Sequence, residues 1–166
     1  MKGQAEVIVF ILLFLIGISL FASATIWGRK IFEDNMDFTK LEAAEKIMID
    51  IDNGVSNVIK FGGIKEIAYP LDGTVEIVDT KTIEIRTPLK IEIQEEWINI
   101  SEGNSYIREK KDGDDLVLQL IYPDGDYIVE FFTDGSSLDS PNYIKLEKNE
   151  TFTNPTSRIK IKITFM

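Results

Sequence analysis

The sequence lacks two residue types that carry much of protein chemistry. It has no cysteine, which excludes a disulfide framework, a thiol nucleophile, an iron–sulfur cluster and a thiolate zinc site. It has no histidine either, and histidine is the usual general base near neutral pH and the commonest metal ligand. Any catalysis would have to rely on carboxylates, lysine or tyrosine. We therefore expect a protein that is not an enzyme, with no catalytic residue, resident metal or cofactor.

Basic residues are scarce, and their position matters more than their number. The 166-residue chain has a net charge of −10. The first 30 residues contain only four charged residues, which are Lys2, Glu6, Arg29 and Lys30. This part therefore holds +2, which leaves −12 for the other 136 residues. Such an acidic domain repels nucleic-acid phosphates and anionic lipid headgroups, so we predict that it binds neither.

The N-terminal end contains one long apolar run. Residues 7–27 are 21 residues without a charge, and as a helix they would span roughly 30 Å, about the thickness of a bilayer's hydrocarbon core. Trp27 stands where an interfacial aromatic is expected, and Arg29 and Lys30 follow it closely. A buried helix of a soluble protein is the alternative, but the remaining chain is too small and too polar to enclose it. The run predicts a membrane-spanning helix.

Two fates of this helix follow from its own residues. It can remain in the membrane as a plain signal anchor. It can also be the apolar part of a secretory signal peptide, because residues 22–24 read Ala-Ser-Ala and would direct cleavage after Ala24. A third fate is suggested by the residues that precede the helix.

The chain opens with Met1-Lys2-Gly3-Gln4-Ala5-Glu6, directly before the apolar run. A short basic leader that ends in glycine, followed by glutamine and an acidic residue, resembles archaeal type IV pilin-like precursors with a class III signal peptide. The resemblance covers residues 1–30. It implies that a prepilin peptidase cuts between Gly3 and Gln4, with Lys2 in the leader, and that the apolar helix stays on the mature chain.

The same resemblance implies an assembly role for Glu6, through contact with a neighbouring subunit. Glu6 would be the third residue of the mature chain, whereas the acidic residue of the family commonly stands fifth. Independently of this resemblance, a carboxylate near the N-terminus of an apolar helix is also favoured by the positive end of the helix dipole. Both interpretations of Glu6 stay open.

These features together predict what the chain does. The basic residues on the two sides of the helix nearly balance, so the large acidic part decides the orientation, with the N-terminus inside and the domain outside. We predict a single-pass cell-membrane protein that assembles with itself or with other pilin-like subunits. It would be a pilin-like subunit or minor pilin of an archaeal surface filament or envelope assembly, and extracellular once processed. The alternative is a membrane-tethered binding or accessory domain, stator-like, that does not polymerise.

Residues 31–63 indicate an amphipathic helix and a connection. Apolar residues recur at helical spacing, at Leu41, Ala44, Met48, Ile51, Val55 and Val58. We expect this stripe to pack on the chain's own sheet, although a coiled coil between copies would use the same pattern. Residues 39–42 match a capping box and predict a new helix start at Thr39, so continuity across residues 31–38 stays open. Gly62 suits the left-handed position that ends a helix.

From residue 64 the apolar period becomes two, which is typical of strands. The predicted strands are residues 74–78, 82–87, 89–93, 116–122, 127–132, 143–146 and 158–165. The first two are expected to form a hairpin, and Pro123-Asp124-Gly125-Asp126 is expected to turn a second one between residues 116–122 and 127–132. Lys160 and Lys162 favour an edge position for the last strand.

The predicted fold class is therefore α+β, with a long N-terminal helix that is first membrane-spanning and then amphipathic. An antiparallel β-sandwich or curled β-sheet domain follows it. The expected divisions are residues 1–30 for leader and membrane or assembly helix, 31–63 for amphipathic helix and connection, and 64–166 for an extracellular β-rich domain.

Few residues of this domain suggest a ligand. The carboxylate clusters at residues 111–115 and 124–126 offer oxygen ligands suited to calcium, but they lack the EF-hand spacing, so we predict ordinary turns. Glu95 and Glu96 would point to opposite faces of an alternating segment, which argues against a carboxylate pair for glycoside chemistry. Two sequons begin at Asn99 and Asn149, which are candidate glycosylation sites in an exported protein.

Overall fold

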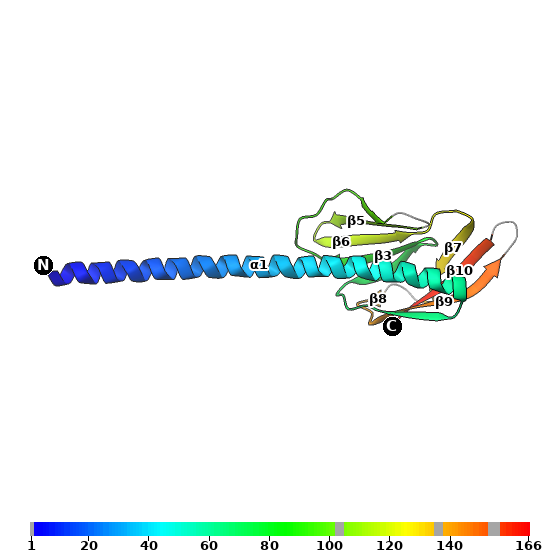
Figure 1. Ribbon diagram of the computed structural model, residues 1–166, viewed down its shortest axis with the longest axis horizontal. Coiled ribbons are helices and arrows are strands. Elements are labelled where there is room, and N and C mark those ends of the chain that lie inside the picture. Colours follow the sequence, from blue (N-terminus) through cyan, green and yellow to red (C-terminus); the bar gives the residue numbers. More distant parts are fainter. Residues whose placement is uncertain (1, 102–104, 135–137, 153–156) are drawn as a thin grey trace. The chain divides into compact units, whose positions relative to one another are not determined.

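The chain forms one long helix followed by two β-sheets (Figure 1). The structure, a computed structural model, describes residues 2–101, 105–134, 138–152 and 157–166, with the backbone alone for residues 2–5, 138 and 139. The elements are α1 (Lys2–Phe61), β1 (Ile64–Ala68), β2 (Thr74–Asp79), β3 (Thr82–Pro88), β4 (Ile98–Ser101), β5 (Tyr106–Asp112), β6 (Asp115–Ile121), β7 (Tyr127–Phe132), β8 (Leu138–Asp139), β9 (Tyr143–Phe152) and β10 (Ser157–Phe165). The predicted α+β class, with a long apolar N-terminal helix, is confirmed.

Helix α1 is continuous from Lys2 to Phe61. Of the two alternatives that the sequence left open for residues 31–38, the structure has the continuous helix, and no new helix starts at Thr39. Residues 31–38 contain neither proline nor glycine, so the helical hydrogen bonds can pass through them. The predicted helix end is confirmed, because Gly62 has a φ of 70° and its N–H donates to the Val58 carbonyl at 3.0 Å. This single hydrogen bond is that of a left-handed C-terminal cap.

The chain divides into two compact units, Met1–Asp37 and Phe38–Met166. In the second unit, the predicted apolar stripe of α1 contributes to the core: Ala44, Met48, Ile51, Val55 and Val58 are buried and Leu41 is half-buried. The same core contains buried side chains from strands of both sheets, such as Leu118 and Leu146. Packing of the stripe on the chain's own sheets is therefore confirmed. Figure 1 shows strands of both sheets beside this part of α1.

The larger sheet, called sheet B, has the strand order β4-β5-β6-β3-β2-β8, and all of its pairs are antiparallel. The predicted hairpin between β2 and β3 is confirmed, and the Lys81 N–H donates to the Asp79 side chain at 2.7 Å within its turn. A second hairpin joins β5 to β6 at Gly113 and Asp114. Gly113 has a φ of 67°, as the first central residue of a type II′ turn requires.

The smaller sheet, called sheet A, has the strand order β1-β9-β10-β7. Its β10–β7 pair is parallel, a departure from the wholly antiparallel arrangement that we predicted. Strand β10 lies between β9 and β7, so its predicted edge position is wrong. Its basic residues pair instead with acidic residues: Arg158 with Glu130, Lys160 with Glu150 and Lys162 with Asp134.

The predicted hairpin around residues 123–126 is also wrong. Strand β6 belongs to sheet B and β7 to sheet A, so these residues cross from one sheet to the other. The physical reason is that β6 already pairs with β5 on one side and β3 on the other. Strand β7 pairs with β10 near the end of the chain, a long-range partner that a local pattern does not reveal.

Residues 89–93, predicted to be a strand, lie in a loop instead. Their alternation is nevertheless genuine, since Leu89 is buried and Ile91 and Ile93 pack against the core. The loop is held by single backbone bonds, from Leu89 N–H to the Asp114 carbonyl at 2.8 Å and from Lys111 N–H to the Gln94 carbonyl at 2.9 Å. The alternation of apolar and polar residues therefore predicted which side chains face inward. It did not predict whether the segment pairs with a neighbouring strand.

Candidate functional site

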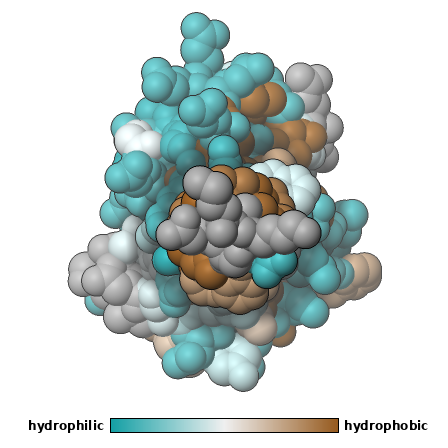
Figure 2. All heavy atoms as spheres, turned by 90° about the vertical axis from the view of Figure 1, so that its left-hand side faces the viewer, coloured by the Kyte–Doolittle hydropathy of each residue, from teal (hydrophilic) through white to brown (hydrophobic). Residues whose placement is uncertain are grey.

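The most distinctive candidate site is the first part of α1. Among the described residues there is one helix that is long and apolar enough to cross a membrane. The apolar stretch within this helix is fully exposed. Exposure is similar on every side, from 47% at Ile16 to 74% at Phe21. Figure 2 shows apolar side chains, in brown, on all visible sides of this helix. A helix apolar all round requires an apolar medium or apolar neighbours.

Three hydroxyl groups in this segment are already satisfied within the helix. Ser19 Oγ donates to the Leu15 carbonyl at 2.8 Å, Ser23 Oγ to the Ser19 carbonyl at 2.9 Å, and Thr25 Oγ1 to the Phe21 carbonyl at 2.8 Å. An unsatisfied hydroxyl in hydrocarbon would cost several kcal/mol. These bonds therefore make the polar positions of the segment compatible with a bilayer, a feature that the sequence analysis missed.

The predicted processing residues lie at the start of this helix. Lys2, Gly3 and Gln4 belong to α1, but their side chains lie outside the described residues. Glu6, the predicted assembly residue, is exposed, and Val9, Phe10 and Leu13 lie beside it on the same face of the helix. Its carboxylate is therefore accessible to a neighbouring molecule.

Charged residues return immediately after the apolar segment. Arg29 Nε lies 3.0 Å from Glu33 Oε1, one helical turn further on, and both side chains are exposed. Exposed pairs of this spacing stabilise a helix by about 0.3–0.5 kcal/mol. The pair thus contributes little to stability, but it marks the end of the uncharged run.

In the second unit, α1 is fixed closely to sheet A. A Cβ atom added to Gly54 would lie 2.9 Å from Leu146 Cδ1 and 3.1 Å from Ile67 Cδ1, so glycine permits close helix-to-sheet packing there. Lys148 Nζ donates to the Ile59 carbonyl at 3.1 Å. Lysine in this position satisfies a carbonyl at the helix C-terminus and complements the negative end of its dipole.

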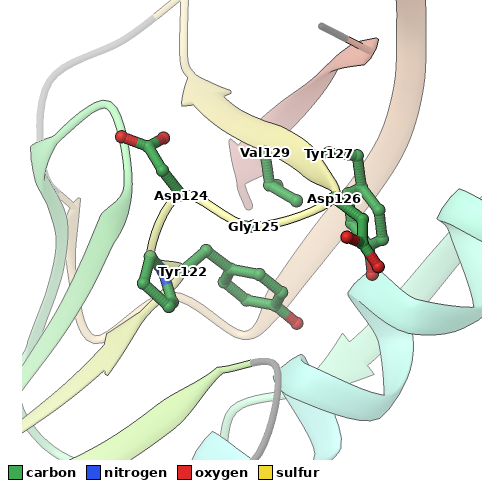
Figure 3. Close-up of a pocket in the computed structure, with 7 residues that line it drawn as sticks. Tyr122, Asp124, Gly125, Asp126, Tyr127 and Val129 are labelled. Carbon is green, nitrogen blue, oxygen red and sulfur yellow. The ribbon is translucent and has the colours of Figure 1, made fainter.

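A polar network fixes the same helix to residues beside sheet B. Ser105 Oγ donates to Asp52 Oδ1 at 2.7 Å, and the Tyr122 hydroxyl donates to the same oxygen. Burial raises the pKa of the Tyr122 hydroxyl, and the Asp52 carboxylate beside it raises that pKa further. Figure 3 shows this hydroxyl directed toward α1. The sequence analysis missed the network, because its members lie on three separate segments.

The residues near Tyr122 do not form the calcium site that was weighed for residues 124–126. They line a hollow of about 220 Å³, but Asp124 and Asp126 point away from each other (Figure 3). Asp124 is bound by Lys81 Nζ at 2.7 Å. In the part of the chain that the structure describes, no three acidic side chains gather where they could hold a metal ion.

A buried glutamate beside a half-buried one is a further feature that the sequence did not reveal. Glu109 on β5 is 8% exposed, and within the described residues its Oε2 atom has no hydrogen-bond partner. Burial raises the pKa of the Glu109 carboxyl, and the charge of Glu45 on α1 raises it further. The pKa of Glu45 is raised by burial and by Glu42. Recognising residues 106–112 as a strand would have placed Glu109 on the same inward face as Ile107.

The outer face of sheet B carries a chain of polar contacts. Arg108 donates to Gln119 Oε1 at 2.7 Å, and Gln119 Nε2 donates to Glu84 Oε2 at 2.6 Å. Arg86 Nε donates to the other oxygen of Glu84 at 2.7 Å. Beyond Arg108, the ring of Trp97 lies 4.2 Å from its guanidinium carbon. Glu84 is buried, and each of its two carboxylate oxygens accepts a hydrogen bond. This row of contacts therefore has a structural role.

The remaining predicted residues lie apart from one another. Glu95 and Glu96 are exposed in the loop before β4, not in a strand. Asn99 and Asn149 are both exposed, the first on β4 of sheet B and the second on β9 of sheet A. Both sequon asparagines are thus accessible to a modifying enzyme.

Comparison with known proteins adds no relative to this description. The chain matches no protein-family model, no curated protein sequence and no solved structure.

Proposed function

We propose that this chain is a pilin-like structural protein of the cell surface, a subunit or minor pilin of a filament or envelope assembly. The observation that carries the proposal is the wholly exposed apolar segment of α1, with its hydroxyl groups satisfied internally. Such a segment is suited first to a bilayer and then to packing against equivalent helices of other subunits.

The charge distribution is compatible with one orientation in particular. The part of the chain after residue 30 carries −12, while Lys2 and the N-terminal amine remain on the other side of the apolar segment. We propose that the N-terminus is inside and that the acidic domain is outside. Under this arrangement the acidic surface keeps the domain in solution and away from anionic headgroups.

The opening residues support processing by a prepilin peptidase. Cleavage between Gly3 and Gln4 would leave Glu6 near the new N-terminus, on the same helix face as Val9, Phe10 and Leu13. A carboxylate in that position can pair with the terminal amine of a neighbouring subunit. In apolar surroundings a charge without a partner is costly, so each of the two groups would need the other.

The test is the intact mass and N-terminal sequence of the protein from its own cells, in wild type and two matched variants. Gly3→Val should abolish a start at Gln4, whereas Ala24→Leu should leave it unchanged. A mature chain that starts at Thr25, and is lost in Ala24→Leu, would instead identify a secreted soluble protein and overturn the proposal.

A membrane-tethered accessory domain is the second candidate, favoured by the position of Glu6 two residues before the place usual for pilin-like chains. Shearing of cells separates the two candidates, because a filament subunit is recovered in the sheared surface fraction and a tethered domain stays with the membrane. Glu6→Gln should lower the sheared yield without changing the melting temperature of the domain. An unchanged yield would remove Glu6 from assembly.

A further inference from the structure

We propose that the outer face of sheet A carries a binding groove for a neutral saccharide. This groove, called the Lys160 groove, has a volume of about 490 Å³. Its lining includes Thr80, Glu130, Phe132, Asn149, Glu150 and Lys160. The volume lies in the range of small-molecule sites in proteins, about 300–1,000 Å³. The proposal goes beyond the structural role above and does not depend on processing or polymerisation.

The floor of the groove is a row of three residues on adjacent strands. Lys160 on β10 stands opposite Glu130 on β7 and opposite Glu150 on β9. Residues opposite one another in a sheet share a face, so the three side chains project on the same side. Lys160 Nζ lies 3.8 Å from Glu150 Oε2, and Arg158 Nη1 lies 3.3 Å from Glu130 Oε1. Each carboxylate thus has a basic side chain beside it.

An irregularity in β9 brings an amide group to this row. The register between β9 and β10 shifts between Lys160 and Ile161, so that Ile161 stands opposite Lys148 while Lys160 stands opposite Glu150. Asn149 is therefore the extra residue of a β-bulge, and bulges redirect a side chain away from the regular ladder. Its exposed amide supplies both a donor and an acceptor to the groove.

Two aromatic rings accompany these polar groups. Phe132 lies two residues after Glu130 on β7, and so on the same face of the strand. Phe152 is partly exposed, and Lys160 Nζ lies 5.1 Å from the centre of its ring. The negative face of an aromatic ring attracts positively polarised hydrogen atoms, such as the C–H groups on one face of a sugar ring.

The charges of the groove select against other classes of small ligand. Glu130 and Glu150 each lie beside a cation, Arg158 and Lys160 respectively, so these side chains leave no unpaired charge to attract an ionic ligand. An apolar ligand would remove these ion pairs from water without replacing their hydration. A neutral polyhydroxylated ligand can instead donate to the carboxylates and the Asn149 carbonyl, accept from Lys160, and lay its C–H face on a phenylalanine ring.

The test uses the full-length chain in lipid nanodiscs, without sugar-based detergent, and saturation-transfer difference NMR. The probes are maltotriose, cellotriose, mannotriose and chitotriose. We expect saturation transfer to at least one probe, and an affinity lowered about tenfold or more by Lys160→Met, the change expected when a charge-assisted hydrogen bond is lost. Asn149→Ala should weaken the same probe.

Two matched variants on sheet B serve as controls. Lys110 also lies near an aromatic ring, with its Nζ atom 5.0 Å from the centre of Trp97, so Lys110→Met removes an equivalent lysine away from the groove. Asn99→Ala removes the other exposed sequon asparagine. Neither change should alter binding of the probe, and the melting temperatures of all four variants should confirm that the domain is folded.

Three results would overturn the proposal. The first is no transfer to any of the four probes at millimolar concentration. The second is equal weakening by Lys160→Met and Lys110→Met. The third is a covalent glycan on Asn149 in the intact mass of the native protein, since that glycan would itself occupy the groove.

Discussion

The two parts of helix α1, up to Asp37 and from Phe38 onward, differ in how their apolar residues are arranged. In the first part, apolar side chains cover every side and are exposed, as at Ile16 and Phe21. In the second part, one stripe is apolar and buried, as at Ile51 and Val55, while Ile49 between its members remains partly exposed. A stripe matches a protein core on one side, whereas all-round apolarity matches a surrounding medium. The pattern, rather than the amount of apolar surface, separates the two roles.

The sharpest test of this comparison replaces one isoleucine in each part by alanine. Ile51 is fully buried and Ile16 is 47% exposed. Ile51→Ala should lower the free energy of unfolding of the domain by about 2–5 kcal/mol, because it removes buried apolar volume and leaves a cavity. Ile16→Ala should leave it unchanged. Thermal unfolding followed by near-ultraviolet circular dichroism measures both, and equal destabilisation by the two variants would contradict the separation.

A charge placed in each part reverses the order of sensitivity. Ile16→Arg introduces a cation within the apolar segment, where insertion scales give a cost of about 2.5–3.5 kcal/mol at the centre of a span. The variant should move from the carbonate-resistant membrane fraction into the soluble or degraded fraction. Ile49→Arg, at a partly exposed position of the second part, is the matched control and should remain in the membrane. Full membrane retention of Ile16→Arg would argue against a span.

Hydroxyl groups give a third comparison between the parts. The Tyr122 hydroxyl donates to the Asp52 carboxylate in the core region, and Ser19 donates to a carbonyl of its own helix. Tyr122→Phe should destabilise the domain by about 1.5–3 kcal/mol, the range for hydrogen bonds to charged groups. Ser19→Ala removes the hydroxyl group and, with it, the cost of placing that group in apolar surroundings. The change should therefore leave the unfolding of the domain unchanged. Chemical denaturation of both variants, at equal lipid content, measures the difference.

Features that depend on the spacing of nearby residues were predicted correctly from the sequence. Features that depend on pairing between distant strands were not. The apolar stripe from Leu41 to Val58, the β2–β3 hairpin and the helix end at Gly62 follow from residues within a few positions of one another, and all three are confirmed. The turn at residues 123–126 and the edge position of β10 depended on which strands pair over long distances, and both predictions were wrong.

The candidate sites divide in the same way. The apolar segment could be found from the sequence because its residues are consecutive, and Glu6 was singled out because it directly precedes them. The Lys160 groove could not, because Glu130, Glu150 and Lys160 meet only through a parallel pair and a bulged antiparallel pair. The Asp52 network joins a helix, a loop residue and the end of a strand, and no spacing rule connects them.

The acidic pair of buried Glu109 and half-buried Glu45 gives the smallest expected effect, and the sign of that effect follows from their pKa shifts. Burial raises the pKa of both carboxyls in the folded state above their ordinary value of 4.5, and the nearby charge of Glu42 or Glu45 raises it further. The folded chain therefore holds these protons more tightly than the unfolded chain does. Their favourable contribution is complete below the ordinary value and is lost as pH rises through the folded pKa values.

Glu109→Gln should accordingly raise the free energy of unfolding near neutral pH, because an amide in this buried position carries no charge to be desolvated. The gain over wild type should shrink as pH falls and vanish below about pH 4, where the unfolded glutamate is also protonated. Denaturation from pH 4 to 8 measures it, with Glu95→Gln in the exposed loop as the control for the change in net charge. A gain that is the same at every pH would mean that Glu109 contributes through packing rather than through its proton.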